Sequence, residues 1–297
     1  MQARRRDRLF WLVLAGVSYI PLLLTRPGMV AADTKEYLYL DPGRLTTGAA
    51  SMWDPNTGLG TVTHQNIGYL FPMGPYYTLV RWLGIPVWVG QRLWMGSLLM
   101  AAGLGVAYCA RRLGLESPGR EVAALAYTLS PYLVDYLART SAILMPWAAL
   151  GWMIGLTAMA ARRGGWRYPA GFALLVALVG GVNATSILLV LVGPALWLVY
   201  AVWGTREVTG RQARRAAAKI GALSVLVSLW WAAGLWAEGM YGLNICVSPR
   251  PSPPCRGRRP PRRCCGAWVT GSSTAGTRCS PGLWPRPVTP NRGGSWA

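Results

Sequence analysis

Charged residues are scarce in this sequence of 297 residues: they make up 13% of the chain, and only ten of them are Asp or Glu. Histidine occurs once. The apolar part of the chain contains no G-x-x-x-x-G-K-[ST], H-E-x-x-H or G-x-S-x-G motif, so ATP hydrolysis, zinc proteolysis and a serine-hydrolase elbow find no support. The absence of heptads and of repeats of about 20 to 50 residues sets aside coiled coils and solenoids.

Regularly spaced cysteines are also missing. Five of the six cysteines lie in residues 246–297, two of them adjacent at Cys264 and Cys265, while Cys109 stands alone in an apolar run. A disulfide or zinc framework needs spacings such as paired C-x-x-C. We therefore assign the cysteines no function.

Apolar residues are abundant instead. They form 53% of the chain, which includes 16 Trp and 13 Tyr. A helix crosses the membrane with about 20 predominantly apolar residues. The sequence thus predicts an all-α, polytopic membrane protein with about seven transmembrane helices, at residues 9–25, 86–110, 122–136, 143–161, 169–182, 187–203 and 220–237.

The basic residues indicate an orientation. The net charge of +20 could suggest nucleic-acid binding, but outside the C-terminal tail the basic residues mostly flank apolar runs. With a cytoplasmic N-terminus, 15 basic residues fall on the cytoplasmic side and 6 on the outer side. We expect a plasma-membrane protein with no nucleic-acid partner and an extracytoplasmic loop at about 26–85 that contains short interfacial helices. A cleavable signal peptide ending at 30–32 is the rival interpretation.

Residues 246–297 differ in composition from the rest. They contain ten Pro, nine Arg and five Cys, and no Ile, Phe or Lys. A disordered basic tail is one interpretation. We favour another, in which GC-rich DNA is read out of frame after Ile245. The predicted organisation is a membrane region at 1–245 followed by a disordered tail at 246–297.

The stretch VAADTKEYLYLDPGRL crowds charges into the start of the outer loop. There Asp33 can meet a lipid-linked substrate at the interface and take a proton from an acceptor hydroxyl. Lys35 can pair with phosphate, and Glu36 would share a face with Asp33 if the segment were helical. The plainer alternatives are that Asp33 is a solvated loop residue or the N-cap of a helix.

The loop RPGMVAADTKEYLYLDPGRLTTGAASMWDPNTGLGTVTHQNIGYLFPMGPYY and the segment SPYLVDYLARTSAILMPWAALGW resemble the N-terminal region of the actinobacterial alpha-1,3-arabinofuranosyltransferases. The resemblance covers about residues 8 to 245. It implies a GT-C glycosyltransferase fold, a decaprenyl-phosphate-linked arabinofuranose donor, an arabinan acceptor of the cell wall, and Asp33 as catalytic base. Family members continue well beyond this region, so a truncated, non-catalytic remnant stays an alternative, as does a transporter fragment.

Further substrate-binding candidates are weaker. Asp41 lies in an Asp-Pro-Gly turn, His64 is the single histidine, and Arg139 could bind phosphate or pair with Asp135 four residues earlier. Asn183 begins a glycosylation sequon, but we expect it to cap a helix. Membrane lipid is an expected partner. No cofactor is predicted with certainty, and a divalent cation stays open.

Overall fold

The computed structural model describes residues 2–33, 36–48, 51–55, 60–62, 65–137 and 139–241. All of them belong to the first of two units, Met1–Ile245, and the second unit, Cys246–Ala297, lies outside the described residues. The predictions for Lys35, His64 and the tail therefore also lie outside them.

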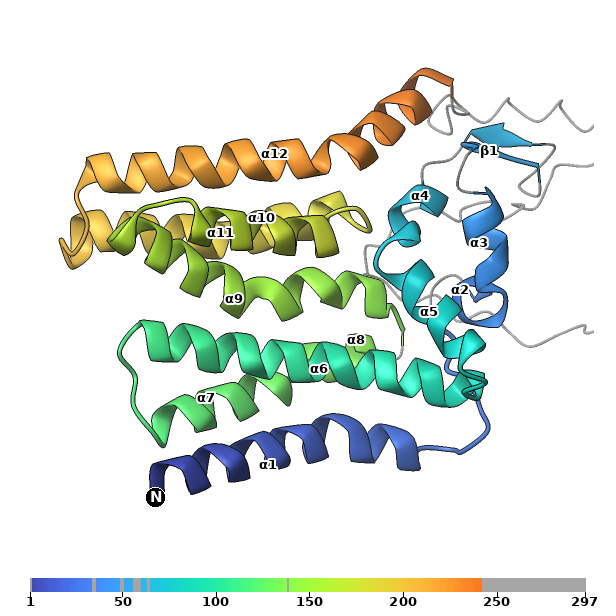
Figure 1. Cartoon of the computed structure of the whole chain (residues 1–297), viewed down its shortest axis with the longest axis horizontal. Coiled ribbons are helices and arrows are strands. Elements are labelled where there is room, and N and C mark those ends of the chain that lie inside the picture. The colour runs from blue at the N-terminus through green and yellow to red at the C-terminus, as the bar shows by residue number, and fades with distance from the viewer. Residues whose placement is uncertain are drawn as a thin grey trace, which may run out of the picture. The chain divides into compact units, whose positions relative to one another are not determined.

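Long helices of the first unit run side by side as a bundle (Figure 1). Its helices are α1 (Gln2–Leu24), α6 (Val87–Arg112), α9 (Ser141–Arg163), α10 (Arg167–Val179), α11 (Ala184–Val199) and α12 (Gly210–Tyr241). A π-helical turn, η1 (Tyr200–Gly204), extends α11, and the short helices α7 (Gly119–Thr128) and α8 (Pro131–Leu137) link α6 to α9. The predicted all-α class is confirmed.

Among the described residues, five helices are long and apolar enough to cross a membrane: Arg5–Leu24, Val87–Arg112, Ser141–Arg163, Ala184–Gly204 and Gly210–Tyr241. Large apolar side chains on α1, α11 and α12 are exposed, among them Leu12, Leu188 and Val225. Such apolar side chains can face lipid, and the helix also pairs its own backbone polar groups, as the membrane interior requires.

Two of the expected spans differ from the structure. The span at 122–136 is divided into α7 and α8, because Pro131 has no amide hydrogen to continue the helix and disfavours helical geometry at Ser130. The span expected at 169–182 is the 13-residue α10, which ends before Gly180 and Gly181.

Helix α9 packs against α6, α10, α11 and α12 and is the centre of the bundle. Its contact with α6 depends on two glycines. A Cβ added to Gly151 would lie 2.4 Å from the carbonyl carbon of Gly105. The two backbones therefore touch, as small residues allow in membrane helix pairs.

A second layer of short elements covers one end of the bundle (Figure 1). It consists of α2 (Tyr37–Leu40), α3 (Pro42–Gly48), the antiparallel strands β1 (Trp53–Asp54) and β2 (Thr61–Val62), α4 (Gln65–Leu70) and α5 (Met73–Trp82). The expected short helices in the loop at 26–85 are confirmed. We call this end of the bundle the capped end and the opposite one, where Arg111, Arg112, Arg162 and Arg163 lie, the arginine-rich end.

Candidate active site

Asp33 lies at the capped end, in the non-helical segment that leads from α1 to α2. Its side chain is buried, with the residue 8% exposed. One carboxylate oxygen, Oδ1, accepts a hydrogen bond of 2.9 Å from the backbone N–H of Ser141. The other, Oδ2, accepts a hydrogen bond from the Ser141 hydroxyl. Two bonds from one residue fix the orientation of this carboxylate.

Ser141 joins three segments at this point. It is the first residue of α9, so its amide is one of the helix's unpaired N-terminal donors, and the positive end of the helix dipole faces Asp33. The Ser141 hydroxyl also accepts a hydrogen bond of 3.2 Å from the indole Nε1 of Trp94 in α6. The carboxylate of Asp33 therefore caps the N-terminus of α9, more than 100 residues away in the chain.

Three buried tyrosines from α2, α4 and α5 lie close enough to Asp33 to be affected by its charge: Tyr39, Tyr69 and Tyr77. Burial raises the pKa of Tyr39 to about 12, with further contributions from the charges of Glu36 and Asp33. Burial and then the Asp33 charge also raise the pKa of Tyr69 and Tyr77. The rings of Tyr39 and Tyr77 are 6.0 Å apart. The hydroxyls of these three tyrosines therefore stay protonated near neutral pH.

A clamp from α6 holds the backbone just before Asp33. The Gln91 side chain, fully buried, accepts from the Ala31 N–H at 2.7 Å and donates to the Ala31 carbonyl at 2.9 Å. Arg92, also buried, donates to the carbonyl of Met29 at 3.2 Å. The hydroxyl of Tyr39 reaches the carbonyls of Ala31 and Asp33. The segment that carries Asp33 is therefore positioned by the bundle and not by its own helix.

Three other predicted site residues, Glu36, Asp41 and Arg139, are exposed in the structure. Glu36 is exposed and does not share a helical face with Asp33, because α2 begins only at Tyr37. Asp41 is exposed and forms an ion pair of 3.2 Å with Arg81. Arg139 forms the predicted pair with Asp135, at 3.8 Å and with both side chains exposed. The expected cap is also confirmed, since the Asn183 side chain accepts from the N–H of Ser186.

Sequence reasoning missed Ser141, Trp94, Gln91 and Arg92. A signal for two of them existed, because Gln91-Arg92 is a polar pair near the start of an apolar run, and ionisable groups at membrane depth are enriched in function. Within the described part of the chain, no three His, Cys, Asp or Glu side chains gather as a metal site would require.

Most of the chain matches a known protein family. The family described as alpha-(1->3)-arabinofuranosyltransferase, N-terminal GT-C domain, matches residues 17–246. The chain belongs to this family. The expected resemblance and the GT-C class of the membrane core are thereby confirmed.

Relatives in this family include two alpha-(1->3)-arabinofuranosyltransferases. The one from Mycobacterium tuberculosis (strain ATCC 25618 / H37Rv) is 32% identical over 231 residues, which cover 76% of this chain and 16% of the relative. The one from Mycolicibacterium smegmatis (strain ATCC 700084 / mc(2)155) is 32% identical over 197 residues, which cover 62% of this chain and 13% of the relative. The chain therefore spans less than a fifth of the length of these GT-C family members.

Solved structures of arabinofuranosyltransferase AftD from mycobacteria have the same fold in the matching region. One cryo-EM structure has a TM-score of 0.70 at 30% identity, and the match covers 78% of this chain and 18% of that protein. A second, of the mutant R1389S, has a TM-score of 0.69 at 31% identity over the same shares. These neighbours are polytopic membrane proteins, as predicted for this chain.

Proposed function

We propose that the chain carries the catalytic region of a membrane arabinofuranosyltransferase, with Asp33 as the general base. The observation that supports this most is the buried carboxylate fixed by Ser141 at the capped end. A carboxylate accepts up to about four hydrogen bonds, so an acceptor hydroxyl can donate to Asp33 while Ser141 keeps it oriented. The relatives' activity gives the reaction type.

In the proposed reaction, an acceptor hydroxyl of arabinan attacks the anomeric carbon of arabinofuranose linked to decaprenyl phosphate. The new C–O bond forms as the bond from that carbon to the phosphate oxygen breaks. The hydroxyl proton passes to Asp33, and decaprenyl phosphate leaves with the electron pair. One displacement from the opposite face inverts the anomeric centre, so a second carboxylate, as used in sugar hydrolysis, is not needed.

The substrate-binding roles of Lys35, Glu36, Asp41, His64 and Arg139 stay predictions. Glu36, Asp41 and Arg139 are exposed around the capped end, where an acceptor glycan can reach them. The family match favours the transferase over a transporter fragment. The chain matches only 16% of the length of the relative from Mycobacterium tuberculosis, so the activity of the chain by itself is also a proposal.

The test uses a chimera in which residues 17–241 of this chain replace the matching region of the full-length mycobacterial relative. Asp33→Asn keeps an oxygen for the Ser141 amide but cannot take a proton. We expect transfer of arabinofuranose to fall by roughly 10²- to 10⁴-fold, the usual contribution of a general base. Equal transfer by the variant, at equal membrane level and melting temperature, would remove the assignment.

The orientation is tested on the chain itself. In a background with all six native cysteines replaced by serine, Met29→Cys lies near the capped end and Leu115→Cys near the arginine-rich end, both at exposed positions. A membrane-impermeant thiol reagent applied to intact cells should label only the cysteine at position 29. Labelling only at position 115 would place Asp33 on the cytoplasmic side and contradict the proposed reaction.

A further inference from the structure

A cavity of about 230 Å³ lies at the arginine-rich end, far along α9 from the site of Asp33. The last turn of α9 and the first third of α12 form its walls. The cavity is lined by four basic residues, Arg162, Arg163, Arg215 and Lys219, and by Gly164, Gly165, Gln212 and three alanines. Four basic side chains therefore share one small cavity.

Only one of these charges is neutralised within the described part of the chain. Arg162 forms an ion pair of 2.5 Å with Glu207. Arg163 donates to the hydroxyl of Tyr168 at 3.3 Å, and Lys219 donates to the carbonyl of Gly165 at 3.1 Å, so both partners are uncharged. No carboxylate of the described residues pairs with Arg215. An anion in the cavity would relieve the repulsion among three positive groups.

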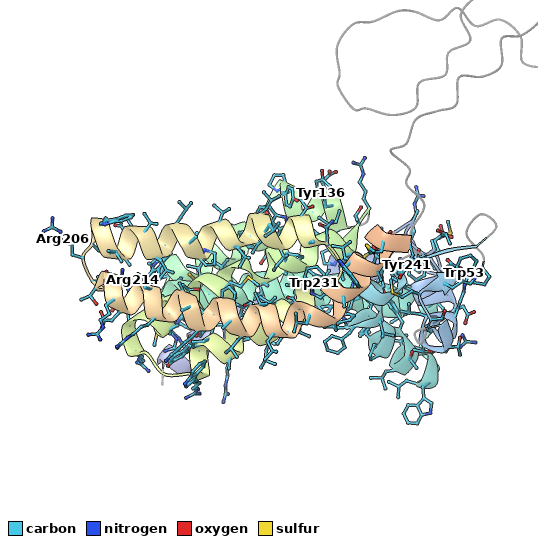
Figure 2. The ribbon with its side chains drawn as sticks, turned by 90° about the horizontal axis from the view of Figure 1, so that it is seen from above. Trp53, Tyr136, Arg206, Arg214, Trp231 and Tyr241 are labelled. Carbon is cyan, nitrogen blue, oxygen red and sulfur yellow. The ribbon has the colours of Figure 1, made fainter. Side chains whose placement is uncertain are left out.

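The cavity lies at the level where lipid head groups are expected. It is at the end of the candidate span Ser141–Arg163, and α12 turns apolar directly after Lys219. The Lys219 Nζ lies 4.8 Å from the centre of the Trp166 ring, and Trp166 is exposed. Exposed Trp residues mark the membrane interface. Figure 2 shows Arg206 and Arg214 at this same end of the bundle, with Trp53 and Tyr241 towards the other.

We propose that this cavity binds the phosphate of an anionic phospholipid head group. Arg163 and Arg215 supply planar donors that match phosphate oxygens, and Lys219 adds a point charge. The buried alanines Ala160, Ala161 and Ala216 form the closely packed floor beneath these groups. The exposed apolar residues of α12, such as Val225, continue from the cavity into the membrane, where acyl chains would lie. This binding is independent of the chemistry proposed for Asp33.

Native mass spectrometry of the full chain, released from nanodiscs, tests the proposal. The nanodiscs contain equal amounts of phosphatidylglycerol and phosphatidylcholine. The double variant Arg215→Gln/Lys219→Gln is compared with Arg206→Gln/Arg211→Gln, which removes the same charge from the same end but lines no part of the cavity. We expect retention of phosphatidylglycerol to fall about tenfold in the first variant only, because each basic group near the membrane contributes appreciably to binding anionic lipid.

Several outcomes would overturn the proposal. Equal losses in the two variants would show diffuse attraction by the basic residues at this end of the bundle and not binding in the cavity. Equal retention of the two lipids by the unchanged chain would exclude recognition of the negative head group. Full displacement of phosphatidylglycerol by millimolar inorganic phosphate would assign the cavity to a soluble anion instead. Equal melting temperatures of the two variants ensure that the comparison concerns binding and not folding.

Discussion

Ser141 donates a hydrogen bond to each carboxylate oxygen of Asp33, although the two residues are 108 positions apart in the chain. Its amide nitrogen lies 2.9 Å from Oδ1, and its hydroxyl donates to Oδ2. Ser141→Ala removes the hydroxyl and leaves the amide. Hydrogen bonds to charged groups contribute about 1.5 to 3 kcal/mol, so we expect the variant to be less stable by roughly that amount. Thermal unfolding of the chain in detergent measures the loss, and Ser141→Thr, which keeps a hydroxyl, should recover much of it.

The same substitution should lower transfer by the chimera through kcat and leave KM nearly unchanged, because Ser141 orients the proposed base and does not hold substrate. A rise in KM with kcat unaltered would instead place Ser141 in substrate binding.

The Gln91 clamp makes a prediction about local stability. Gln91→Ala removes both hydrogen bonds to Ala31 and leaves its buried N–H and C=O without these partners, which costs about 1 to 3 kcal/mol. Hydrogen exchange measured by mass spectrometry should become faster in the peptide that covers residues 26–33. Peptides from α10 serve as the internal control and should not change. Unaltered exchange at 26–33 would show that the clamp does not hold the segment.

Tyr39 makes the free energy of unfolding depend on pH in alkali. Its pKa is raised from 10 to about 12 in the folded chain, so the folded state keeps a proton that the unfolded state releases. This contribution is fully present below pH 10 and is lost as the pH rises to about 12. We expect Tyr39→Phe to weaken the fall in stability between pH 10 and 12. Some slope should remain, because Tyr69 and Tyr77 are shifted in the same direction.

The contact between α6 and α9 predicts a large difference between two glycine substitutions. In Gly151→Ala the new Cβ would meet the Gly105 backbone at 2.4 Å, so the helices must separate, and we expect a loss of roughly 2 kcal/mol or more. Gly221→Ala in α12 is the matched control, since nothing lies within 4 Å of its Cβ. Removing a helical glycine there should be neutral or stabilise by up to about 1 kcal/mol. Similar melting temperatures for the two variants would contradict the tight crossing.

The exposed ion pairs should matter little for stability. Asp41→Asn and Arg139→Gln each break a pair whose side chains are at least 60% exposed. Such pairs contribute about 0 to 1 kcal/mol and are weakened by salt. Thermal unfolding should therefore shift only slightly. A loss above about 2 kcal/mol for either variant would mean that the pair has a structural role not visible in its exposure.

Sequence patterns were sufficient for five of the seven expected membrane helices, while the role of Asp33 stays a proposal. Apolar runs bounded by arginines predict where α1, α6, α9, α11 and α12 lie, because the membrane imposes both length and polarity. The short helices of the capped end were expected only in general terms. Their bounds depend on packing against the bundle, which local patterns do not record.

The surroundings of Asp33 could not be predicted for a physical reason. Ser141 looks like an ordinary first residue of a helix, and Trp94 like any aromatic in a membrane span. Both acquire their significance from long-range contacts across 108 and 47 positions. The expected partnership of Asp33 with Glu36 failed because it relied on local helical spacing, whereas the clamp at Ala31 holds this segment in a non-helical conformation.

Helix α9 has 23 residues, with Ser141 at its first position and Arg163 at its last, about 33 Å apart. Gly151 lies near the middle of the helix and packs against the backbone of Gly105 in α6, so the two helices cross most closely there. A tilt about this crossing would displace the first turn of the helix, so the tight crossing also keeps the Ser141 amide within reach of the Asp33 carboxylate.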